Sequence, residues 1–173
     1  MNNNSLLKDS LFFAEEITFD VSGKKVSQNE IDEIDDFPGK EDFVRFYTTH
    51  NGGIFLHGAR FFPEECYTTS IKGYPYITMD CFLSIPVDNT NKEMNIEMWK
   101  DALERMNENY EDFILFHIPF AIDAEENTFW IDIQSGEIKY TDDQTCINPN
   151  KDAVIVASSF KDFCKRIRNE KVR

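Results

Sequence analysis

The chain has 173 residues, 41% of them hydrophobic and sixteen of them Phe, and its formal net charge is −14. That length predicts a single domain with a substantial buried core, and the composition is too apolar for a disordered chain. The acidity argues against nucleic acid or an anionic membrane surface as the ligand, because both are bound through Lys and Arg. No apolar run approaches the ~20 residues of a membrane span and no signal-peptide pattern opens the chain, so we expect a cytoplasmic protein.

Near the N-terminus, turn and capping residues predict a β-hairpin followed by a short helix. β-Branched residues lie on both sides of Ser22-Gly23, so residues 17–26 are expected to form the hairpin. Ser27 is expected to cap a helix over about residues 28–36, with Glu30 in the capping-box position. Phe37-Pro38 should end this helix, because Pro lacks a backbone donor and disfavours helical geometry in the residue before it.

A second helix is predicted over about residues 41–50. Its apolar face has helical spacing and consists of Phe43, Phe46 and Tyr47. Asn51-Gly52-Gly53 should end the helix, because Gly adopts the left-handed conformation without a Cβ clash. The triplet is not expected to bind phosphate, since a helix C-terminus presents carbonyl groups.

The middle of the chain is predicted to hold short strands and the longest helix. Residues 54–56 should form a short buried strand and residues 76–85 a longer one, with a weak strand signal at residues 60–62. A helix is expected over residues 94–110, where a stripe of helical period predicts a buried face: Trp99, Leu103, Met106 and Tyr110. Seven acids lie in or beside this helix: Glu93, Glu97, Asp101, Glu104, Glu108, Glu111 and Asp112.

The second half of the chain is predicted to be mainly β-structure. The expected strands cover residues 113–117, 128–133, 137–140 and 153–156, with turns at residues 123–127 and at Ser135-Gly136. Alternation along the second of these strands places Phe129, Ile131 and Ile133 on one face and Trp130 and Asp132 on the other.

A helix is predicted at the C-terminal end. Ser158 or Ser159 should cap it, and its buried face should consist of Phe160, Phe163, Cys164 and Ile167. The segment from Lys161 onward holds six bases and two acids, which leaves −18 on residues 1–160. A basic helix end of this kind complements the negative C-terminal dipole. Helices followed by antiparallel-type strands and a last helix indicate an α+β fold.

The sequence contains no pattern that predicts catalysis, a cofactor or a metal. His50, His57 and His117 have no paired metal-ligand spacing, and no Walker, Gly-x-Gly-x-x-Gly or Gly-x-Ser-x-Gly motif occurs. A thiolate–imidazole pair of His57 with Cys66 lacks any supporting motif. The four cysteines are scattered and are expected to be reduced and structural: Cys66, Cys81, Cys146 and Cys164. We therefore expect a protein that is not an enzyme.

Acidity is the feature of the sequence that stands above background. Seven acids occur with a single Lys in thirteen residues: Glu30, Asp32, Glu33, Asp35, Asp36, Glu41 and Asp42. They form either a solvated helix face or an electrostatic docking surface for a basic partner. On charge density alone, the predicted partner-binding residues are Glu30, Asp32, Glu33, Asp35 and Asp36, with Asp142 and Asp143 as a second patch.

The order of features along residues 28–168 resembles the SUKH superfamily, which includes fungal cell-wall regulators and bacterial immunity proteins of polymorphic toxin systems. The motifs that carry the resemblance are Phe37-Pro38, Phe43-x-x-Phe46-Tyr47, Asn51-Gly52-Gly53, Ile118-Pro119-Phe120-Ala121-x-Asp123, Asn127-Thr128-Phe129-Trp130-Ile131-Asp132, Gly136-Glu137-Ile138 and Val156-Ala157-Ser158-Ser159-Phe160-x-x-Phe163. Two positions depart from the pattern: Phe37 stands where the family often has Leu, and Glu126 stands where it often has Gly.

The resemblance implies a central, mostly antiparallel sheet flanked by helices and a non-enzymatic role, the binding and neutralisation of a cognate toxin, often a nuclease. It supplies no catalytic residues. Since nuclease toxins bind phosphates and tend to be basic, the acidity agrees with this role. An intracellular regulatory or scaffold module of the same fold is the alternative. The sequence does not indicate the oligomeric state.

Overall fold

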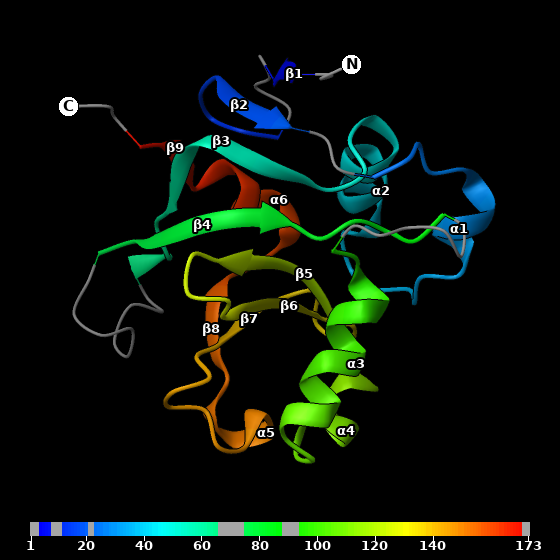
Figure 1. Cartoon of the computed structure of the whole chain (residues 1–173), viewed down its shortest axis with the longest axis vertical. Helices are drawn as coiled ribbons and strands as arrows, with labels where there is room; N and C mark the ends of the chain where they lie inside the picture. Colours follow the sequence, from blue (N-terminus) through cyan, green and yellow to red (C-terminus); the bar gives the residue numbers. More distant parts are fainter. Residues whose placement is uncertain (1–3, 8–11, 21–22, 66–74, 88–93, 171–173) are drawn as a thin grey trace.

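Nine strands form one antiparallel sheet in the part of the chain that the computed structural model describes, residues 4–7, 12–20, 23–65, 75–87 and 94–170. The strands are β1 (Asn4–Leu7), β2 (Ile17–Asp20), β3 (Gly53–Phe61), β4 (Ile77–Phe82), β5 (His117–Asp123), β6 (Thr128–Asp132), β7 (Ile138–Thr141), β8 (Val154–Ala157) and β9 (Ile167–Asn169). From β1 to β8 each strand pairs with the next, and β9 pairs with β3 (Figure 1). Local connections of this kind suit antiparallel pairing.

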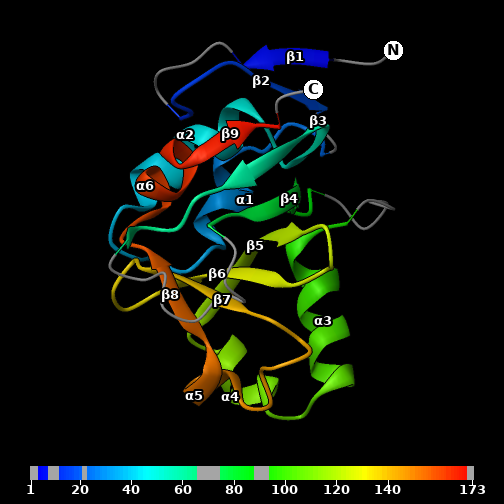
Figure 2. The ribbon, with the colours of Figure 1, turned by 90° about the vertical axis from the view of Figure 1, so that its left-hand side faces the viewer.

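Six helices accompany the sheet within the described residues. They are α1 (Gln28–Asp32), α2 (Lys40–Thr49), α3 (Ile96–Met106), α4 (Tyr110–Ile114), α5 (Pro149–Asp152) and α6 (Phe160–Lys165). α2 and α6 lie side by side, whereas α3, α4 and α5 gather at the other end of the molecule (Figures 1 and 2). The α+β class and the mostly antiparallel sheet flanked by helices are confirmed.

The main core is built largely of Phe rings between the sheet and the α2–α6 pair. The predicted face of α2 is buried, and the ring of Phe46 lies 4.7 Å from that of Phe82 and 5.6 Å from that of Phe160. Edge-to-face and tilted rings add to the energy of burial itself. Phe129 and Ile131 face this core, as the alternation predicts.

A second, smaller core lies on the opposite face of the sheet. Trp130 is completely buried there against Leu103, Tyr110 and Phe113. Its indole Nε1 donates a hydrogen bond to Thr141 Oγ1 at 3.0 Å. The sheet is therefore covered on both faces near β6.

Asn51 and Gly52 form a buried corner after α2, as their position at the helix end predicts. The Asn51 amide donates to the carbonyls of Lys24 (2.7 Å) and Ile85 (2.9 Å) and accepts from the Ile85 N–H (2.7 Å). Gly52 has φ +71°, and a Cβ there would lie 2.8 Å from the Ser84 nitrogen. Both the left-handed backbone and the close approach therefore require Gly.

The predicted hairpin over residues 17–26 is wrong. β2 pairs with β1 and β3, and no strand forms at residues 23–26. Instead the Gly23 N–H donates to the Asn51 carbonyl at 2.9 Å, so this segment is held by the corner after α2. The capping box of Ser27 and Glu30 is confirmed, but α1 ends at Asp32 rather than near residue 36.

The predicted long helix over residues 94–110 is two helices. α3 stops at Met106, where Asn107 caps it in an extended conformation, and α4 begins at Tyr110. Met106, the last residue of α3, is 69% exposed and therefore does not belong to a buried stripe. α4 includes Phe113, so the strand expected over residues 113–117 is wrong. The strand β5 begins at His117.

Long-range pairing produced elements that local patterns missed. β3 joins the two short strands predicted at residues 54–56 and 60–62, and only Phe55 of the first is buried. Ile167 is buried as expected but lies in β9, not in the last helix. β1 and α5 were not predicted. The cap of α6 is Ser159, whose side chain accepts from the Asp162 N–H.

Glu126 has a left-handed backbone, with φ +66°, in the turn between β5 and β6. We predict that Glu126→Gly stabilises the protein by about 0.5–1 kcal/mol, because a side chain in this conformation costs energy that Gly avoids. Ala124→Gly, in the same exposed turn, is the control and should destabilise by about 0.4–1 kcal/mol through unfolded-state entropy. Urea unfolding measures both. Equal destabilisation by the two variants would contradict the prediction.

Candidate functional site

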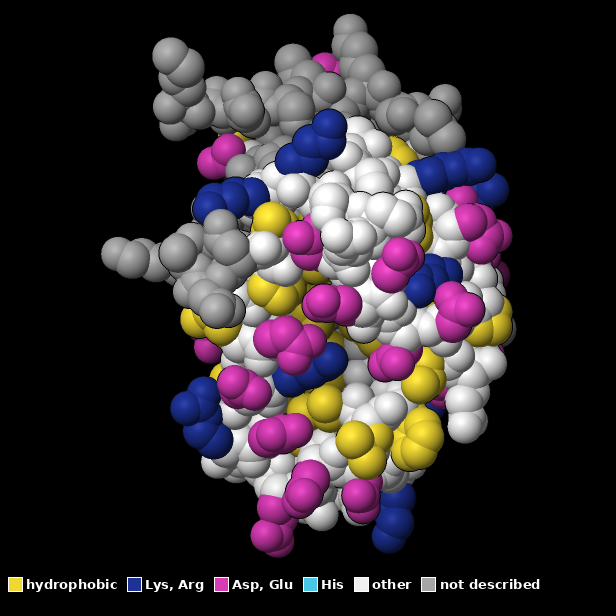
Figure 3. Space-filling model, turned by 90° about the vertical axis from the view of Figure 1, so that its right-hand side faces the viewer, with side chains coloured by type: hydrophobic (Ala, Val, Ile, Leu, Met, Phe, Trp, Pro, Cys, Tyr) yellow, Lys and Arg dark blue, Asp and Glu magenta, His cyan; other side chains and the backbone are white. Residues whose placement is uncertain are grey.

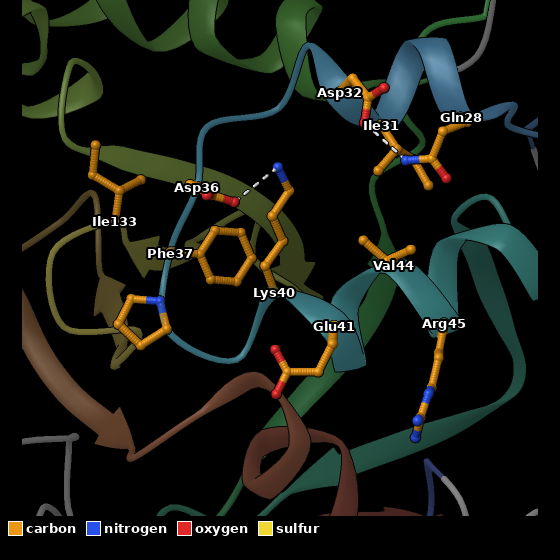
Figure 4. A pocket seen from close by; sticks show the side chains of 11 residues that line it. Gln28, Ile31, Asp32, Asp36, Phe37, Lys40, Glu41, Val44, Arg45 and Ile133 are labelled. Carbon is orange, nitrogen blue, oxygen red and sulfur yellow. Dashed lines mark hydrogen bonds and ion pairs between the residues drawn. The ribbon is translucent and has the colours of Figure 1, made fainter.

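An open groove lies between α1 and α2 and has a volume of about 880 Å³. Apolar side chains provide much of its lining, with charged groups around them (Figure 4). The lining residues are Gln28, Ile31, Asp32, Asp36, Phe37, Pro38, Lys40, Glu41, Val44, Arg45 and Ile133. We call this hollow the α1–α2 groove. Its lining holds three carboxylates against two cations, Lys40 and Arg45, so the groove offers a partner an apolar surface with a small excess of negative charge.

The capping box holds α1 at one wall of the groove. The Glu30 carboxylate accepts a hydrogen bond from the Ser27 N–H at 2.8 Å and a second one from the Ser27 hydroxyl. These bonds lower the pKa of Glu30. Glu30, one of the predicted partner-binding residues, therefore has a local structural role.

The other four predicted residues of this patch are exposed on α1 and on the loop that follows it. Asp32, Glu33, Asp35 and Asp36 all present their carboxylates to solvent, although Asp32 accepts from Gln28 Nε2 at 2.8 Å. The Asp36 side chain is 98% exposed, and Lys40 Nζ lies 3.4 Å from its Oδ1. That ammonium also donates to the Ile34 carbonyl at 2.6 Å, so the single Lys of the patch is turned inward.

The second predicted patch, Asp142 and Asp143, borders a different hollow of about 600 Å³ at the C-terminal end of α3. Asp143 lines it beside Tyr110, whose hydroxyl donates to the carboxylate at 3.4 Å. Partial burial of its carboxyl group raises the pKa of Asp143. No residue lines both hollows, and the two predicted patches do not form one site.

A larger acidic surface comes from α3, α4 and the turn between them. Residues 97–112 carry six exposed acids and only two bases: Glu97, Asp101, Glu104, Glu108, Glu111 and Asp112 against Lys100 and Arg105. α1 and α3 both lie toward the side that Figure 3 shows, where acidic side chains outnumber basic ones. Sequence reasoning counted these acids but did not join them to the patch at α1, because only folding places both helices on one side.

His117, Asp132 and Lys139 meet on three adjacent strands. The Phe113 carbonyl can only accept, so His117 Nδ1, 2.8 Å away, carries the proton and leaves Nε2 as an acceptor. Lys139 Nζ lies 3.0 Å from that Nε2 and 2.8 Å from Asp132 Oδ2. Burial, reinforced by the Lys139 ammonium, lowers the pKa of His117 despite the Asp132 carboxylate. The cluster therefore joins three strands through a neutral imidazole.

The residues considered for catalysis are not brought together among the described parts of the chain. His57 is exposed on β3, and Cys66 lies outside the described residues. The other three cysteines are free and buried, and burial raises the pKa of Cys81 to about 12 and that of Cys146 to about 11. Within the described ranges, no group of three or more His, Cys, Asp or Glu side chains is arranged to hold a metal ion.

Comparison of the chain with protein-family models, with curated proteins and with solved structures found no match. Among the described residues, none of the helices has the length and apolar character needed to cross a bilayer. The functional argument therefore starts from the α1–α2 groove and the carboxylates around it.

The neutral state of His117 predicts a pH dependence of stability. Its folded-state pKa lies below the unfolded value of about 6.5, so the unfolded chain takes up the proton first as the pH falls. Stability is fully present above about pH 6.5 and should fall below it. Urea midpoints at pH 7.5 and 5.5 should differ less in His117→Gln than in the wild type. An unchanged difference would show that His117 does not contribute.

Proposed function

We propose that this chain is an immunity protein, of the kind found in the SUKH superfamily, that binds and neutralises a basic toxin domain in the cytoplasm. The observation that carries the proposal is the acidic side of the molecule, which holds the carboxylates of α1 and its loop, at the α1–α2 groove, and also those of α3 and α4. The sequence resemblance supports the same role.

A single-sign surface of this kind favours a partner of opposite charge. It accelerates encounter and rejects partners that carry the same sign. A nuclease toxin must hold phosphates and therefore presents cationic side chains around its catalytic centre. An acidic protein that covers those cations blocks access of the nucleic acid, so inhibition requires no catalytic residue on the inhibitor.

The second candidate is an intracellular regulatory or scaffold module of the same fold. The apolar lining of the α1–α2 groove is the observation that favours it, because such a groove also suits a peptide segment of a host protein. A gene neighbourhood without toxins, together with several unrelated partners, would favour this candidate.

The test of the proposed function is binding and protection. The toxin domain encoded beside this gene should co-purify with the chain and lose its activity in the complex. If the domain neither binds nor is inhibited, the proposal is wrong.

Reversal of two exposed charges should weaken the encounter with the partner. Asp35→Lys with Asp36→Lys is expected to lower the association rate constant about tenfold at low salt and to reduce its salt dependence, because charge complementarity mainly sets the on-rate. Folding should be nearly unchanged, since both side chains are exposed. Surface plasmon resonance across a salt series measures the rates.

The matched control for this reversal is Asp20→Lys with Asp80→Lys. It makes the same change in net charge on β2 and β4, away from the α1–α2 groove. An association rate constant that falls equally in both double variants would mean that total charge, and not this patch, steers the partner.

A further inference from the structure

Two large hydrophobic side chains are exposed next to each other where α4 turns into β5. Leu115 is 64% exposed and Phe116 is 50% exposed, although both lie in a run of apolar residues that a strand would have buried. α4 ends at Ile114, and the Phe116 N–H donates to the Phe113 carbonyl at 3.2 Å, so the turn projects these two residues outward. Adjacent exposed residues of this size are typical of interaction sites.

The turn that carries these side chains lies next to the α1–α2 groove. The Ile133 N–H donates to the Phe116 carbonyl at 3.0 Å, one step beyond the paired residues His117 and Asp132 of β5 and β6. This bond places the backbones of Phe116 and Ile133 side by side. Ile133 lines the groove at its β6 end (Figure 4). The turn with Leu115 and Phe116 therefore borders the β6 end of the groove, and we call the apolar side chains of the two together the apolar strip.

Carboxylates lie on both sides of this strip. Glu111 precedes Leu115, the C-cap residue of α4, by four positions, so these two residues share one side of the helix, and Asp112 follows Glu111. At the other end Asp36 lines the groove together with Ile133. Figure 3 shows hydrophobic side chains between acidic ones on this side of the molecule. An apolar centre with a charged rim is the usual anatomy of a protein interface.

We propose that Leu115 and Phe116 are the apolar anchor of the docking surface for a basic protein, with Ile133 linking them to the α1–α2 groove. This inference rests on the proposed function and adds the residues that hold the partner after encounter. The occupant is a protein whose contacting surface has an apolar centre and cationic residues around it. A second copy of this chain does not fit, because the acids on the rim would face the same acids.

The test compares single substitutions in binding to the toxin domain encoded beside this gene. Phe116→Ser and Leu115→Ser should each raise the dissociation constant about thirtyfold or more. The increase should come mainly from faster dissociation, as expected for a central hydrophobic contact. Leu56→Ser is the matched control: Leu56 is 40% exposed on β3, distant from α4 (Figures 1 and 2), and its substitution should leave the dissociation constant within about twofold. Thermal unfolding of each variant confirms that it is folded.

The outcomes separate this inference from the proposed function. Wild-type affinity in folded Phe116→Ser and Leu115→Ser variants, with a toxin domain that the wild type binds, would overturn the anchor and leave the immunity role standing. Absence of any binding by the wild type would overturn the immunity role and with it the anchor. Sedimentation of the chain alone gives a third readout: self-association that Phe116→Ser abolishes, with toxin binding unaffected, would assign the strip to a second copy and contradict the inference.

Discussion

The buried side-chain amide of Asn51 joins three segments on which the α1–α2 groove depends. Its amide nitrogen donates to Lys24 and Ile85, and its carbonyl oxygen accepts from the Ile85 N–H. Asn51 is only 2% exposed, and buried polar groups of this kind are costly unless they are bonded. Because Lys24 lies shortly before the cap of α1 and Asn51 follows α2, this amide holds the entry to one helix against the exit from the other.

From that corner, packing decides which side chains reach solvent. α2 turns Phe43, Phe46 and Tyr47 into the Phe-rich core, which leaves Glu41, Val44 and Arg45 along the groove. α3 and α4 bury Leu103, Tyr110 and Phe113 against Trp130, which leaves their acids outside. The acidic side is thus a consequence of two separate cores that each orient helices by their apolar residues.

Local patterns predicted those elements whose cause is local. The Ser27–Glu30 capping box, the apolar face of α2, the Asn51–Gly52 corner and the alternation along β6 all depend on residues within a few positions of one another. Prediction failed where distant pairing competes with local preference. The helix expected at residues 94–110 breaks at Asn107, whose side chain donates to the Ile147 carbonyl from forty positions away. β9 is a strand because it pairs with β3, which is distant in the sequence.

The sequence by itself determined the acidity, the α+β class and the residues that fill the main core, because composition and apolar periodicity act along the chain. It also indicated a charged patch at residues 30–36. Only the tertiary structure brought that patch and the acids of α3 and α4 to one side, and only the turn after α4 exposed Leu115 and Phe116. The sequence shows that a segment is charged or apolar, but only its packing against the rest of the chain decides which of its side chains face water.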